Sequence, residues 1–246
     1  MEHGVNWSLT LRRWVGAGLA AIALAGPAQA EDRPFLRLDT ALVGDDERTL
    51  EVSTLLSRTR DEHSLRVRLE YNLSPVLAAE MEMGWANERG GPARERNLEL
   101  GVRQVLVDHH REGWGLAVRW AMEWEKSAAQ SWRLDGPVVV AAFVLPLMDK
   151  QGRLHANLGA SRRNSVGNTR AVWGVGADVP VAHSFALFAE AAGRVTDDRL
   201  VHGGLRWWIK PEKLAFDVSL SRTRTLATGD MARGVHVGLN IFDLDL

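Results

Sequence analysis

The sequence has no cysteine, which excludes a disulfide framework and a thiolate metal site. With 30 basic and 31 acidic residues, its formal net charge is -1 at pH 7, so no overall electrostatic field favours nucleic acid as a partner. After residue 30, no apolar run approaches the roughly twenty residues that a membrane-spanning helix needs. Lysine occurs only at positions 126, 150, 210 and 213. Most basic groups are therefore arginines, which suit bidentate pairing with carboxylates in a narrow space.

The start of the chain has the organisation of an export signal. Arg12 and Arg13 end a short basic region, an apolar run covers residues 14–25, and Ala28-Gln29-Ala30 provides a small-residue cleavage site. The apolar run is too short to span a bilayer. We therefore predict a signal peptide over residues 1–30 that uses the general secretory route, with cleavage after Ala30.

The mature chain shows strand periodicity nearly throughout. Leu65 and Val67 alternate with Arg66 and Arg68, for example, as apolar and polar residues do in a strand with one buried face. Most of these runs are near ten residues, the length of a tilted transmembrane strand, whereas strands in soluble domains are usually nearer five or six. Twelve runs are present, at residues 48–58, 62–73, 76–87, 95–107, 113–125, 136–147, 152–161, 169–179, 184–194, 200–209, 214–223 and 232–242.

The connections between the runs alternate in length. Those at Ser74-Pro75, residues 109–111 and Pro211-Glu212 are tight, whereas those at residues 86–94 and 126–135 are longer and polar. Short turns at one end, long loops at the other and an even number of strands are typical of outer-membrane barrels with periplasmic termini. We therefore predict an all-β fold, a transmembrane antiparallel up-and-down β-barrel of about 12 strands over residues 48–246, after a periplasmic segment at residues 31–47.

A soluble sandwich or a lipocalin-like barrel would also alternate apolar and polar residues. Strand length, the connections and the export signal favour the membrane barrel, with outer-membrane lipids as partners. Aromatic residues near strand ends favour it too, because such residues form girdles at membrane interfaces. They are Tyr71, Trp85, Trp114, Trp124, Trp207 and Phe216.

Turn positions predict the register of two hairpins. A loop at residues 73–75 and a turn at Pro211-Glu212 each place apolar residues opposite apolar ones and opposite charges face to face. The predicted charge pairs are Arg68 with Glu80, Arg66 with Glu82, and Arg206 with Asp217.

Two places along the chain break the simple register. A symmetric hairpin around residue 111 would oppose Arg103 to Arg119, so we expect a slip of two residues there. The alternation also changes parity after Ile241. Either a bulge lies near Phe242 or the last residues extend past the strand.

A short stretch resembles a known group of proteins. Leu69-Glu70-Tyr71-Asn72-Leu73-Ser74, followed by Glu80 and Glu82, is similar to the early strands of uncharacterised bacterial outer-membrane barrels. These barrels are grouped as transporters, and some are named after a phenol-degradation pathway. The resemblance covers about a third of the chain and implies a twelve-stranded barrel with a transport role. It implies no catalytic residues.

The polar face of the strands holds the candidate functional residues. Both signs of charge are represented there in near balance, whereas a strong ion filter would show one sign in excess. These groups either pair with one another inside the barrel or line a narrow polar path for a small solute. The candidates are Arg66, Arg68, Glu70, Glu80, Glu82, Glu99, Arg103, Arg119, Glu123, Arg170, Glu190, Arg206, Asp217 and His236.

Three functions are compatible with these observations. The first is a narrow channel or transporter for a small-molecule solute. The second is a lipid-modifying enzyme, which would need a serine near a histidine such as His155, His202 or His236, although no serine lies at a convincing spacing. The third is a structural barrel whose residues 31–47 anchor a partner. We predict no catalytic site, metal or cofactor, since His109-His110 alone is a weak metal signal.

Several properties cannot be predicted from the residues. The sequence leaves open which solute or reaction is involved, whether the lumen is open or filled, and which oligomeric state the protein adopts. It also leaves open whether residues 35–43 add a further strand.

Overall fold

The computed structural model describes residues 34–42, 48–88, 94–128, 130–147, 152–164 and 167–245. From residue 48 on, the described chain consists of strands and their connections, with one short helix, α2 (His109–Glu112). No helix among the described residues is long and apolar enough to cross a membrane. The strands are β1 (Thr49–Thr59), β2 (Glu62–Ser74), β3 (Leu77–Glu88), β4 (Arg94–Val107), β5 (Gly115–Lys126), β6 (Arg133–Leu147), β7 (Gly152–Arg163), β8 (Asn168–Ala182), β9 (Phe185–Arg194), β10 (Asp198–Lys210), β11 (Leu214–Thr225) and β12 (Met231–Asp245).

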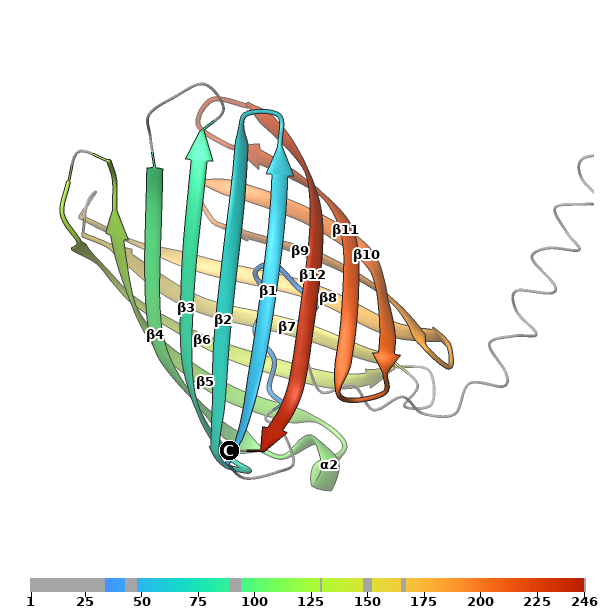
Figure 1. Cartoon of the computed structure of the whole chain (residues 1–246). Helices are drawn as coiled ribbons and strands as arrows, with labels where there is room; N and C mark the ends of the chain where they lie inside the picture. Colours follow the sequence, from blue (N-terminus) through green and yellow to red (C-terminus); the bar gives the residue numbers. More distant parts are fainter. Residues whose placement is uncertain are drawn as a thin grey trace, which may run out of the picture.

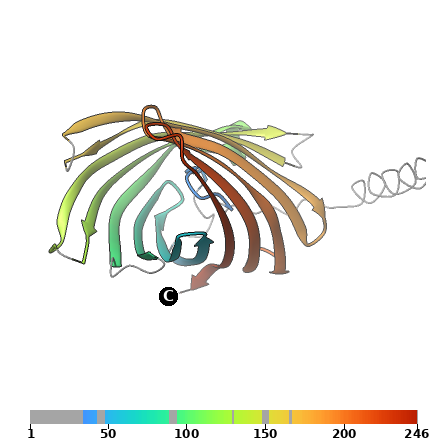
Figure 2. The same ribbon diagram turned by 90° about the horizontal axis from the view of Figure 1, so that it is seen from above.

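The strands form one closed ring in which each pairs with its neighbours along the chain. Every pairing is antiparallel, and β1 closes the ring against β12, with Thr49 opposite Asp245. Figures 1 and 2 show the tilted strands from the side and the ring from above. The predicted antiparallel up-and-down barrel and its count of twelve strands are confirmed.

The barrel has an apolar outer surface and a charged interior. Large apolar side chains such as Leu158 and Leu220 are 65% and 64% exposed, whereas Arg103 and Arg206 inside the ring are only 1% and 2% exposed. A soluble protein would reverse this arrangement, because apolar surface is stable only away from water. The outer surface therefore requires a lipid environment.

Connections at the two ends differ less in length than expected. Only residues 60–61 separate β1 from β2, and residues 108–114 connect β4 to β5. That second connection was predicted to be a tight turn at 109–111. It is longer because it contains α2, whose first turn donates the His110 N–H to the N-cap side chain of Asp108 and which ends at Gly113 in the left-handed region.

The predicted register is correct for one of the two hairpins and wrong for the other. Arg206 lies opposite Asp217 between β10 and β11, as expected. Between β2 and β3 the prediction is wrong by two residues, since Arg68 lies opposite Glu82. The physical reason is that β2 continues through Ser74, which moves the turn to residues 75–76.

The predicted slip between β4 and β5 is also wrong, because Arg103 lies directly opposite Arg119. At the C-terminus the bulge is present: the register against β1 shifts between Ile241 and Leu244, and Asp243 has a φ of 47°. Phe242 continues the inward parity of His236 and Asn240, and it packs against Trp208 with ring centroids 5.3 Å apart.

The N-terminal residues 34–42 lie inside the barrel (Figures 1 and 2). They pair with no strand, so the described residues in the range 35–43 do not extend the sheet, and residue 43 lies outside the described part. Ala41 and Leu42 belong to a buried cluster with Ala78, Val105, Ala117 and Val144. We call residues 34–42 the lumen segment. Of the segment predicted at residues 31–47, positions 31–33 and 43–47 are outside the described residues.

Candidate functional site: the charged lumen and the segment within it

A network of arginines and carboxylates occupies the lumen beside β2 to β5. Glu80 is its centre: Arg68 lies 2.8 Å from one carboxylate oxygen, Arg119 lies 2.6 Å from the same oxygen, and Arg103 lies 3.3 Å from the other. Arg103 also pairs with Glu70. The opposed guanidinium groups of Arg103 and Arg119 thus share the Glu80 carboxylate, which offsets their repulsion and explains why no register slip is needed.

Other predicted lumen residues form separate pairs. Arg66 lies 3.1 Å from Glu82, a diagonal contact in the observed register. Arg206 donates two hydrogen bonds of 2.8 Å to Asp217. Arg170, at one end of β8, pairs with Asp197 in the connection between β9 and β10.

The remaining predicted residues are Glu99, Glu123, Glu190 and His236. Glu99 pairs with Arg119 and lies opposite Glu123 between β4 and β5. Glu190 lies 3.0 Å from His202, and the His202 and His236 rings are 5.6 Å apart. Each predicted residue is therefore buried or half-buried inside the ring, but in several clusters and not in one site.

His236 has two serine neighbours. Its Nδ1 atom lies 2.7 Å from the hydroxyl of Ser57, and its Nε2 atom lies 2.7 Å from that of Ser221. The three residues come from β1, β11 and β12. Sequence spacing does not indicate this group, because the serines are 179 and 15 positions away from the histidine.

The wall of the barrel binds the lumen segment mainly through its main chain. The Glu190 carboxylate accepts hydrogen bonds from the backbone N–H groups of Leu36, Arg37 and Leu38, at 2.6, 3.3 and 3.1 Å. Arg66 donates to the carbonyl of Leu36 at 3.2 Å. The converging N–H groups form a small concave surface of the kind that binds anions.

Contacts to the lower part of the segment continue this pattern. Arg103 donates to the carbonyl of Thr40 at 3.4 Å. The Asn157 amide, oriented to satisfy its neighbours, donates to the carbonyl of Asp39 at 3.0 Å and accepts from the N–H of Asp39 at 2.5 Å. One side chain of the wall thus binds both main-chain groups of Asp39.

Side chains of the segment add fewer contacts. Arg37 forms a bidentate pair with Asp198 at 2.8 and 2.7 Å, and Asp39 lies 3.6 Å from Arg119. The Phe35 ring lies 4.9 Å from that of His155. Leu38 packs against Gly174 and Gly176, where an added Cβ would overlap its methyl groups.

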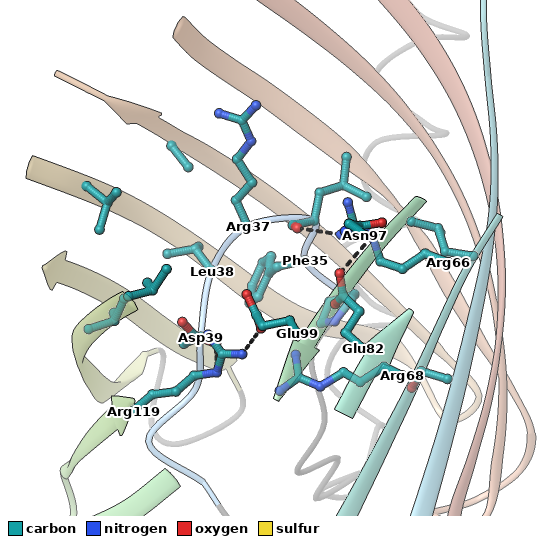
Figure 3. Close-up of a pocket in the computed structure, with 18 of the residues that line it drawn as sticks. Phe35, Arg37, Leu38, Asp39, Arg66, Arg68, Glu82, Asn97, Glu99 and Arg119 are labelled. Atoms are coloured by element: carbon teal, nitrogen blue, oxygen red, sulfur yellow. Dashed lines mark hydrogen bonds and ion pairs between the residues drawn. The ribbon is translucent and has the colours of Figure 1, made fainter. Parts of the chain in front are cut away.

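A cavity of about 430 Å³ remains beside the segment. Figure 3 shows it between the segment and β2 to β5, with Arg66, Arg68 and Arg119 on its wall. Glu82, Glu99 and Glu123 also line it. Both signs of charge therefore face one space, and the cavity is large enough for a small polar molecule.

Little in the residues of the lumen segment predicts its position inside the barrel. Phe35 and Leu38 flank charged residues, a pattern also found in ordinary polar segments. Asn157 and Glu190 become recognisable as its binding residues only when their distance to residues 36–39 is known.

At the barrel end that carries α2, burial lowers the pKa of His109, and the charges of His110 and Arg153 lower it further. Among the described residues, no group of three or more histidines and carboxylates is arranged to hold a metal ion.

Together, the ring and its polar interior define a class: a membrane-spanning β-barrel whose lumen is partly filled by its own N-terminal segment.

No known protein family and no curated protein matches the sequence. Many solved structures have a similar fold, among them the following three. An outer-membrane channel from Pseudomonas putida F1 has a TM-score of 0.60 at 9% identity, over 85% of this chain and 100% of that one. The KdgM porin has 0.56 at 8%, over 78% and 98%. The outer-membrane phospholipase A of Escherichia coli has 0.52 at 11%, over 78% and 92%. At such low identity the likeness concerns the fold alone.

Proposed function

We propose that this protein is a narrow channel or transporter for small polar solutes in a bacterial outer membrane. One observation carries the proposal: a polar cavity of about 430 Å³, lined by both signs of charge, lies inside a barrel whose outer surface is apolar. Solutes would move along the barrel axis past the paired arginines and carboxylates. The solved structures of similar fold include a channel and a porin, which supports the proposal.

The location and export route belong to the same proposal. Transmembrane β-barrels of this type are found in outer membranes. The N-terminal features of an export signal, with cleavage after Ala30, supply the route, and outer-membrane lipids would then surround the ring.

Conductance across a planar bilayer tests the proposal. The purified full chain is expected to give small unitary currents, because the lumen segment occupies part of the path. A variant that lacks residues 34–42 is expected to conduct more, with weak selectivity between cations and anions, since the charges of the lumen nearly balance. Absence of current from both proteins, each shown to be folded, would contradict the proposal.

A second candidate function rests on Ser57, His236 and Ser221. A histidine within 2.7 Å of a serine hydroxyl could act as its general base. Both histidine nitrogens bind serines, however, and the group faces the lumen, whereas a lipid substrate would meet the outer surface. A fluorophosphonate probe distinguishes the candidates: covalent labelling that His236→Ala abolishes would favour a hydrolase, and absence of labelling would exclude serine-based hydrolysis here.

A further inference from the structure

The contacts of the lumen segment point to a ligand class. We propose that the wall that binds residues 34–42 is a peptide-binding site, which the segment occupies as an intramolecular ligand, and that short peptides are the solutes it accepts. The proposal rests on the proposed channel function. It names the substrate class of the same lumen.

The wall of the barrel binds main-chain groups, which every peptide has. Glu190 accepts three consecutive backbone N–H groups, and Arg66 and Arg103 donate to backbone carbonyls. Asn157 binds the N–H and the carbonyl of one residue. None of these contacts depends on the side chain of the bound residue, so another peptide can form them.

The wall groups that bind the segment are buried. Glu190 is 3% exposed, Arg103 is 1% exposed and Asn157 is 9% exposed. Buried polar groups require partners, and here main-chain groups of a peptide add to those in the wall, which are His202 for Glu190 and the carboxylates of Glu70 and Glu80 for Arg103. If the segment leaves, the wall presents convergent groups that water satisfies less well than a second peptide does.

The lumen has space for a short peptide beside the segment. The cavity of about 430 Å³ lies directly against residues 34–39 and carries arginines and carboxylates on its wall. A short peptide has an ammonium group, a carboxylate group and amides. Each of these finds a complementary group in the cavity or on the wall.

The test uses the full chain with a weakened segment and an unchanged wall. Arg37→Ser, Leu38→Gly and Asp39→Ser together remove the ion pairs and the packing that the side chains of the segment add to its main-chain hydrogen bonds. A fluorescent peptide with the sequence of residues 34–42 is then titrated into the detergent-solubilised variant, and its anisotropy is measured. We expect saturable binding. No binding to a variant that retains the heat-dependent gel shift of a folded barrel would overturn the inference.

Two further titrations test main-chain recognition. N-methylation of the peptide at the positions of Leu36, Arg37 and Leu38 removes the N–H groups that Glu190 accepts, and it should weaken binding at least about tenfold. Glu190→Gln in the protein should weaken binding similarly. The matched control Asp135→Asn also changes a buried carboxylate, which pairs with Arg163 and does not line the cavity, and it should alter binding less than about twofold. Equal binding of the methylated and unmethylated peptides would overturn the inference.

If the triple variant does not fold, hydrogen exchange on the unaltered protein gives the same answer. Excess free peptide should speed exchange of the backbone amides of residues 36–38, because it competes for Glu190. Unchanged exchange at saturating peptide would overturn the inference. Failure of the two proposals is distinguishable: conductance without peptide binding removes only the peptide site, whereas peptide binding without conductance removes only the channel.

Discussion

At the scale of the residue, Glu80 is the carboxylate at the centre of the arginine network in the lumen. Its side chain is 2% exposed and lies within ion-pair distance of three guanidinium groups. Removal of one member of such a buried group leaves charges without a partner, which is more costly than the loss of a surface pair.

We therefore expect Glu80→Gln to lower the free energy of unfolding by about 3 kcal/mol. Urea unfolding in lipid vesicles, followed by tryptophan fluorescence, measures this. Glu88→Gln is the control, since Glu88 is exposed at the end of β3, and it should change stability by less than about 0.5 kcal/mol. Equal effects of the two substitutions would show that the network does not stabilise the barrel.

His109 predicts a pH dependence at the end that carries α2. Because burial lowers its pKa in the folded protein below the usual 6.5, the unfolded chain binds more protons in mild acid. Its contribution to stability is therefore present above pH 6.5 and is lost as the pH falls toward the folded pKa. His109→Gln should reduce the fall in stability between pH 7 and pH 5, measured by the same unfolding assay. An unchanged pH profile would contradict the role of burial.

At the scale of the element, alternation of residues predicted the strands well because each strand has a lipid face and a lumen face. The same parity predicted which charged residues point inward. Register was harder to predict: Arg68 pairs with Glu80 as expected, but diagonally, because the register lies two residues from the expected one. The position of a turn is determined by a few local bonds, so a sequence pattern defines it only to within a residue or two.

The slip expected at Arg103 and Arg119 is a related error. Opposed like charges are unfavourable in an isolated hairpin. Here β2 and β3 supply Glu70 and Glu80, which the local sequence of β4 and β5 does not contain. Such a contact arises from neighbouring strands of the ring and could not be predicted from one hairpin.

The lumen segment gives a prediction at the same scale. A valine at Gly174 would overlap the side chain of Leu38, since an added Cβ would lie 2.6 Å from its Cδ2 atom. Loss of this packing weakens the segment, so Gly174→Val should raise the mean current of the full chain about tenfold. Ala171→Val, on the exposed face of the same strand, is the control. Equal currents from both variants would show that Leu38 does not hold the segment.

At the scale of the whole molecule, the predicted cleavage of the signal peptide sets where the mature chain begins relative to Pro34, which is buried inside the ring. Cleavage after Ala30 leaves only residues 31–33 ahead of the lumen segment, which span at most about 10 Å. Mass spectrometry of the purified protein should therefore find Glu31 as the first residue. A protein that begins at Met1 yet keeps the segment in the lumen would contradict the predicted signal peptide.

The mobility of the whole barrel on a denaturing gel gives a further prediction at this scale. A ring with no free strand edge resists detergent, so the unheated protein should migrate differently from the boiled protein on a denaturing gel. Identical mobility would indicate that the closed ring does not form in solution.

The pairing of β1 with β12 also has a consequence for the order of events during folding. This seam joins residues that are far apart in the chain, such as Thr49 and Asp245, so its loop-closure entropy is the largest in the ring and its formation is late. The lumen segment precedes β1 in the chain, so it is attached to one of the two strands that form this seam. Once the seam is formed, the segment can enter only through an end of the barrel. Burial of the segment and closure of the ring are for this reason coupled steps, and a chain that closes too early must thread its own N-terminus to reach the native state.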